Sequence, residues 1–132
     1  MFTYQNYCQQ DQSLSFQQAD NIHQKIVEAI QNNNQGQLLY EEILKAGKEY
    51  IQIRMDWAFL TKEEKKKINE TRTQKHNAVI SSFDALASFC QLNHLDSCWR
   101  DEIGYEENGK GYRKRIGDMG CYLAFITSLS TR

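Results

Sequence analysis

Residues 61–92 read TKEEKKKINETRTQKHNAVISSFDALASFCQL, and this stretch decides the fold. Seven of its side chains recur at steps of three and four residues, the spacing of one face of an α-helix. They are Ile68, Arg72, His76, Val79, Phe83, Leu86 and Cys90. Thr61 and Glu64 fit a capping box, in which the side chain of each residue accepts a hydrogen bond from the backbone N–H of the other. The stretch therefore predicts a helix of roughly eight turns.

The rest of the chain predicts further helices joined by polar connections. Apolar residues keep the helical spacing over residues 15–30, 37–60 and 112–129, and a short helix is predicted over 96–103. The 132 residues include no proline, the residue that breaks helix interiors. Together these patterns predict an all-α protein, a four- to five-helix bundle.

Two segments outside the helices complete the predicted organisation. Residues 1–13 are polar, without a helical period, and are interpreted as an N-terminal arm, so that residues 14–132 form a single helical domain. A glycine-containing loop precedes the last helix. Gly47 lies inside the second helical pattern, where glycine costs about 1 kcal/mol relative to alanine, and it is therefore predicted to mark a close helix crossing.

Several large side chains near the second predicted helix could be taken for a binding patch. They are Tyr40, Tyr50, Met55, Trp57 and Phe59. Their spacing along the helix favours the simpler interpretation, in which most of them belong to the core.

Arg72 and His76 are polar residues on the otherwise apolar face of the longest helix. They are four residues apart and project from one side of it. One interpretation is structural: Asp118 of the last helix joins them in a buried polar cluster, because a buried carboxylate needs a cation or donors. The other is catalytic, since a histidine exchanges protons near neutral pH and an arginine stabilises a phosphate.

The same pair resembles the Arg–His motif of HEPN domains, which are helical bundles that often assemble two such motifs across a dimer. Three residues, Thr73 to Lys75, separate Arg72 from His76, fewer than in that family. The resemblance implies a metal-independent ribonuclease acting through Arg72 and His76, and a homodimer.

A second resemblance covers about half of the chain, from Arg72 onward. It rests on Arg72, His76 to Ile80, Tyr112 to Asp118 and Cys121 to Leu123. These short motifs resemble an uncharacterised family of small proteins from low-GC Gram-positive bacteria. That family implies no activity, but small proteins of this kind are often carried by mobile elements, which suggests a regulator or an inhibitor of host defence.

The charge distribution predicts a local basic surface. The net charge of −1 excludes a general polyanion binder, but residues 62–75 hold six basic and three acidic side chains. Two runs of basic residues open predicted helices, at the end where the helix dipole disfavours positive charge. They are Lys65, Lys66 and Lys67, and Arg113, Lys114 and Arg115. Both runs are predicted to contact a macromolecular partner, a protein in the first place and a nucleic acid as the alternative.

No cofactor or metal is expected. Glu106 and Glu107 are adjacent but lack further ligands nearby, and the four cysteines show no C-x-x-C spacing and are interpreted as free buried thiols. No apolar run approaches the roughly 18 residues of a membrane span, and no secretory signal is visible. The sequence thus predicts a cytoplasmic protein without a membrane partner.

The leading functional prediction is a non-enzymatic protein that binds a macromolecular partner, with no catalytic residues. Two alternatives stay open: a HEPN-like ribonuclease that uses Arg72 and His76, and a toxin-neutralising or immunity protein.

Overall fold

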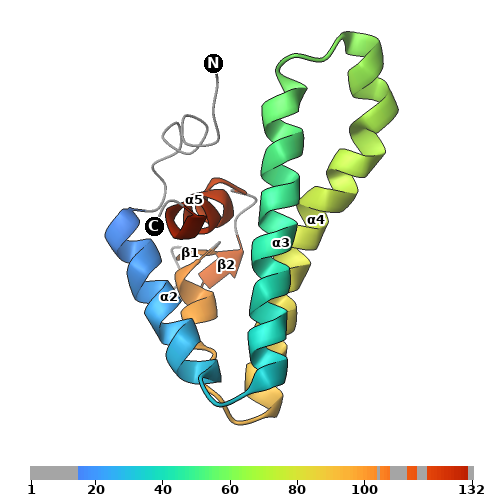
Figure 1. The fold of residues 1–132 in the computed structure, drawn as a ribbon. Coiled ribbons are helices and arrows are strands. Elements are labelled where there is room, and N and C mark those ends of the chain that lie inside the picture. The colour runs from blue at the N-terminus through green and yellow to red at the C-terminus, as the bar shows by residue number, and fades with distance from the viewer. Residues whose placement is uncertain (1–14, 104, 108–112, 116–118, 131–132) are drawn as a thin grey trace.

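The computed structural model describes residues 15–103, 105–107, 113–115 and 119–130. This part of the chain contains four α-helices, and the predicted all-α bundle is confirmed (Figure 1). They are α2 (Phe16–Ile30), α3 (Asn34–Trp57), α4 (Lys62–Leu92) and α5 (Met119–Ser130). The short 3-10 helix η1 (Cys98–Glu102) follows α4, and the strands β1 (Tyr105–Glu107) and β2 (Arg113–Arg115) form a small antiparallel hairpin.

Side-chain caps fix where the first three helices begin. The predicted capping box of α4 is present: Thr61 Oγ1 accepts from Glu64 N at 3.1 Å, and Glu64 Oε1 accepts from Thr61 N at 2.9 Å. Ser15 and Gln18 form a second capping box at the start of α2. Asn33 Oδ1 accepts from Gly36 N at 2.9 Å, so α3 begins at Asn34, three residues before the predicted start.

Helices α3 and α4 form one long antiparallel hairpin, and α2, η1 and α5 pack beside only part of it (Figure 1). The buried residues of α3 end at Ile51, and those of α4 begin at Val79. None of residues 52–78, all of which the structure describes, is buried. We call this segment the hairpin end. Figure 1 shows it extending past α2 and α5, with the α3–α4 turn at its tip.

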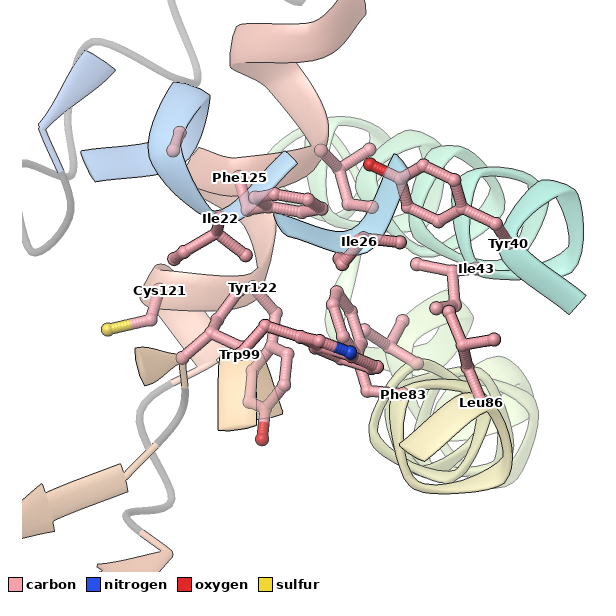
Figure 2. Packing of buried hydrophobic residues seen from close by; sticks show 14 of the residues in the cluster. Ile22, Ile26, Tyr40, Ile43, Phe83, Leu86, Trp99, Cys121, Tyr122 and Phe125 are labelled. Carbon is pink, nitrogen blue, oxygen red and sulfur yellow. The ribbon is translucent and has the colours of Figure 1, made fainter. Parts of the chain in front are cut away.

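The core lies where the other elements cover the hairpin. Phe83 of α4 is its centre: the centroid of its ring lies 5.0 Å from that of Tyr122 and 5.7 Å from that of Phe125, both on α5. Trp99 of η1 packs into the same cluster (Figure 2). Phe83, Tyr122, Phe125 and Trp99 are all 0% exposed. The predicted face of α4 is therefore buried from Val79 onward, which is the half of the helix where that face is apolar.

Gly47 confirms the predicted close crossing. It is buried on α3, and a Cβ atom built at this position would lie 2.6 Å from Cγ1 of Ile126 on α5. Because Ile126 is itself 0% exposed, its side chain has little room to move away. The absence of a side chain at Gly47 thus lets α5 pack directly on α3.

We expect Gly47→Ala to lower the free energy of unfolding by about 1–2 kcal/mol, because overpacking outweighs the gain in helix propensity. Urea unfolding followed by circular dichroism measures the change. Lys48→Ala, at the exposed neighbouring position, is the control and should change stability by less than about 0.5 kcal/mol. A stabilised Gly47→Ala variant would contradict the crossing.

The last helix is shorter than predicted. Helix α5 begins at Met119, and Arg113–Arg115 belong to β2, so the prediction that this basic run opens a helix is wrong. In the hairpin, the backbone of Glu106 pairs with that of Lys114, and the backbone of Glu107 with that of Arg113. Strands of three residues are too short to show a two-residue period, so the sequence pattern could not predict them.

The predicted short helix before this hairpin is present as the 3-10 helix η1. Asp96 Oδ1 accepts from Cys98 N at 2.9 Å just before this helix, whose N-cap residue, Ser97, makes no side-chain cap hydrogen bond. The predicted arm, residues 1–13, lies outside the described residues, as does the glycine loop around residues 108–112.

Candidate interaction surface

The hairpin end differs in charge from the rest of the chain. Residues 52–78 contain seven basic and four acidic side chains, whereas the remaining residues contain nine basic and thirteen acidic ones. The projecting segment therefore has a net positive charge, whereas the rest of the chain has a net negative charge. Such a segregated charge attracts acidic partners and orients their approach.

Trp57 organises the cations of the hairpin end. The Arg72 guanidinium carbon lies 5.0 Å from the centroid of the half-buried indole, and Lys65 Nζ lies 5.7 Å from it. Both distances fit cation–π contacts. Arg72 Nη2 also donates to Asn69 Oδ1 at 3.2 Å, and Arg72 Nε is covered, with no hydrogen-bond partner among the described residues. Trp57 thus orders two of the positive charges on α4.

Phe59 is the exposed apolar residue at the tip. It lies in the turn between α3 and α4, where its backbone N–H donates to Asp56 O at 3.0 Å, and its side chain is 75% exposed. Phe59 is the one of the five large side chains that lies outside the core and is exposed, because α3 has ended and no other described element covers the turn. Tyr40 and Tyr50 are buried as predicted, and Met55 and Trp57 are half-buried.

The predicted lysine run lies next to this apolar tip. Lys66 and Lys67 are exposed, while Lys65 is half-buried against Trp57. None of the three has an ion pair within the described part of the chain. The hydrogen bonds from Thr61 lower the pKa of Glu64, so this carboxylate is charged and serves the helix cap. Lys66 and Lys67 are therefore available to contact an external acidic group, whereas Lys65 already contacts Trp57.

The second predicted basic run does not join this surface. The backbone of Arg113, Lys114 and Arg115 forms β2, which lies beside the body of the bundle and away from the hairpin end (Figure 1). Sequence reasoning grouped the two runs because both were expected at helix starts. The structure keeps only the first of them at a helix N-terminus.

An ion pair closes the base of the hairpin end. Lys75 Nζ of α4 lies 2.9 Å from Glu49 Oε2 of α3, and this contact lowers the pKa of Glu49. Both side chains are about 40% exposed, so the pair contributes little to stability. Because Lys75 is paired with Glu49, it is not available to a partner, unlike Lys66 and Lys67 nearer the tip.

His76 and Arg72 contact different aromatic residues of α3. The His76 ring meets Tyr50 edge-on with centroids 5.5 Å apart, and its Nδ1 lies 3.2 Å from Asn77 Oδ1. Both His76 and Arg72 are half-buried. Asp118, the third member of the predicted polar cluster, lies outside the described residues. The sequence did not predict these contacts of His76 with Tyr50 and of Arg72 with Trp57. The signal was present, because Tyr50 and Trp57 share one predicted helix face that an antiparallel hairpin turns toward α4.

A polar cavity of about 290 Å³ lies elsewhere, between α4 and η1. Each nitrogen of Arg100 on its wall already donates a hydrogen bond: Nε to Asp84 Oδ1 at 3.0 Å, Nη1 to Ile103 O at 2.7 Å and Nη2 to Tyr122 OH at 2.9 Å. The exposed Cys98 also lines it, and a hydrogen bond to Asp96 together with nearby carboxylates raises the pKa of the Cys98 thiol. Such a thiol stays protonated at neutral pH and is a poor nucleophile.

The cysteines of the described part are free thiols. Cys90 and Cys121 are buried as predicted, and burial raises the pKa of Cys90, but Cys98 is exposed. Among the described residues, no three His, Cys, Asp or Glu side chains gather closely enough to hold a metal ion. None of the described helices is both long enough and apolar enough to cross a membrane.

Comparisons of the chain with protein-family models, with curated proteins and with solved structures found no match.

Proposed function

We propose that this protein acts in the cytoplasm without catalysis, by binding a macromolecular partner through the hairpin end. The observation that carries the proposal is the pairing of an exposed Phe59 with unpaired Lys66 and Lys67 on a segment that lies beyond the core. Binding surfaces combine an apolar centre with a charged or polar rim.

Stability alone does not account for this segment. Residues 52–78 bury no side chain fully, so they add little to the core around Phe83. The segment is nevertheless well formed, with a capping box at Thr61 and two cations ordered by Trp57. A preformed helical projection with an apolar tip suits recognition, because fewer side chains must be ordered when a partner binds.

The proposal predicts that Phe59→Ser combined with Lys66→Glu and Lys67→Glu weakens partner binding at least about tenfold, the effect of losing an interface hot spot. Immobilised wild type and variant are compared for the macromolecules they retain, and Kd values follow by titration.

The matched control carries the same three types of change on α3, where Leu38→Ser, Lys45→Glu and Lys48→Glu also alter exposed positions. It should bind like the wild type. Equal loss in both variants would point to a general charge effect, and no loss in the first would end the proposal.

The alternative functions remain predictions. A ribonuclease acting through Arg72 and His76 would cleave RNA, and His76→Ala would abolish the cleavage. A toxin-neutralising or immunity protein would copurify with its target. A homodimer, and a role as a regulator or host-defence inhibitor from a mobile element, rest on the sequence resemblances alone.

A further inference from the structure

We infer that the partner of the hairpin end is a protein whose surface offers an apolar socket for Phe59, rimmed by Asp and Glu side chains. This inference rests on the proposed function and specifies the chemistry of its partner. Three observations support it: the charge pattern, the contacts of the Trp57 ring with two cations, and the exposed position of Phe59.

The charge pattern favours a protein over a nucleic acid. Binding to a phosphate backbone relies on many uncompensated cations, because each neutralised phosphate releases a counterion. At the hairpin end, Glu63 and Glu64 stand directly before the lysine run, and Glu70 follows it. Acidic side chains among the cations repel an unbroken row of phosphates, whereas a protein rim can offer carboxylates at some positions and donors at others.

The aromatic residues of the hairpin end also favour a protein over a nucleic acid. Single-stranded nucleic acids stack their bases on open aromatic faces. The half-buried Trp57 ring already carries the side chains of Lys65 and Arg72. Phe59 remains, a single apolar knob at the tip of the turn. A lone knob flanked by cations matches an interface anchor that fills one pocket and is surrounded by a polar rim.

A second copy of this chain is a weaker match. Two hairpin ends facing each other would bring Lys66 and Lys67 of both copies together, and like charges placed across an interface oppose association. The net positive charge of the hairpin end is complemented instead by an acidic partner surface.

The test uses three defined probes under the same low-salt conditions: a random copolymer of glutamate and tyrosine, polyglutamate, and single-stranded poly(U). Titration calorimetry gives Kd for each. We expect the copolymer to bind most tightly. Phe59→Ser should weaken copolymer binding about tenfold and leave polyglutamate unchanged, whereas Lys66→Glu with Lys67→Glu should weaken both. Circular dichroism confirms that each variant is folded.

Other results would overturn the inference in distinguishable ways. Tightest binding to poly(U), lost in the charge variant, would identify a nucleic-acid partner and leave the proposed function standing. A wild-type dimer in sedimentation that Phe59→Ser dissociates would identify a second copy as the occupant. If the copolymer does not bind, or binds wild type and Phe59→Ser equally, the inference that the partner has an apolar socket for Phe59 is wrong. If no probe distinguishes the variants, the proposed function fails as well.

Discussion

Replacing Phe83 with alanine should lower the free energy of unfolding by about 3–5 kcal/mol, the cost typical of truncating a fully buried phenylalanine. The Phe83 ring is 0% exposed and touches Tyr122 and Phe125 at the same time, so its loss opens a cavity between α4 and α5. Urea unfolding followed by circular dichroism measures the effect. A domain of this size is stabilised by only about 5–15 kcal/mol, so the variant should be close to unfolding.

Phe59→Ala is the matched control, since it removes the same side chain from the hairpin end. Phe59 is 75% exposed, and surface changes of this kind usually stay within about 0.5 kcal/mol. The contrast between the two variants separates the body, which holds the fold, from the tip, which we assign to binding. A loss above about 2 kcal/mol in Phe59→Ala would give the tip a structural role and weaken the functional assignment.

The sequence was sufficient to predict the longest helix and the side of it that is buried. The capping box at Thr61 and the apolar period through Val79, Phe83 and Leu86 are local signals, and the structure confirms them. Gly47 could also be predicted as a crossing point, because a glycine inside a helical pattern needs a packing reason.

The region before α5 could not be predicted in the same way. Arg113 to Arg115 are three charged residues in a row. They do not alternate with apolar residues, so nothing in their pattern indicates a strand. The apolar pattern of α5 then extended the predicted helix backward to Tyr112, although α5 begins at Met119. Only the pairing with β1, a contact between separated segments, determines the structure here.

The candidate site was predicted in part. A run of lysines at a helix start is visible in the sequence, and Lys66 and Lys67 are indeed exposed. The exposure of Phe59 was not predictable from its spacing, because it depends on where α3 ends and on how far the hairpin extends past α5. Trp57 lies two residues away and is half-buried, so neighbouring aromatic residues have different roles.

Arg100→Met should lower the free energy of unfolding by about 3 kcal/mol, because each buried acceptor left without a donor costs roughly 1–3 kcal/mol. The side chain of Arg100 is 7% exposed and holds three segments together: α4 through Asp84, α5 through Tyr122 OH and its own loop through Ile103 O. Its guanidinium also lies 5.8 Å from the Phe83 ring. No periodic pattern marks Arg100, so the sequence did not identify this contact.

The matched control for Arg100→Met is Asp84→Asn. The side chain of Asp84 is 40% exposed, so water can replace part of what the carboxylate provides, and we expect a loss below about 1 kcal/mol. The comparison shows whether Arg100 acts through its ion pair or through the two buried oxygens. Because the bonds to Ile103 O and Tyr122 OH are both buried, the hydrogen-bond explanation requires Arg100→Met to be the costlier change. Equal losses would instead assign the stabilisation to the ion pair with Asp84.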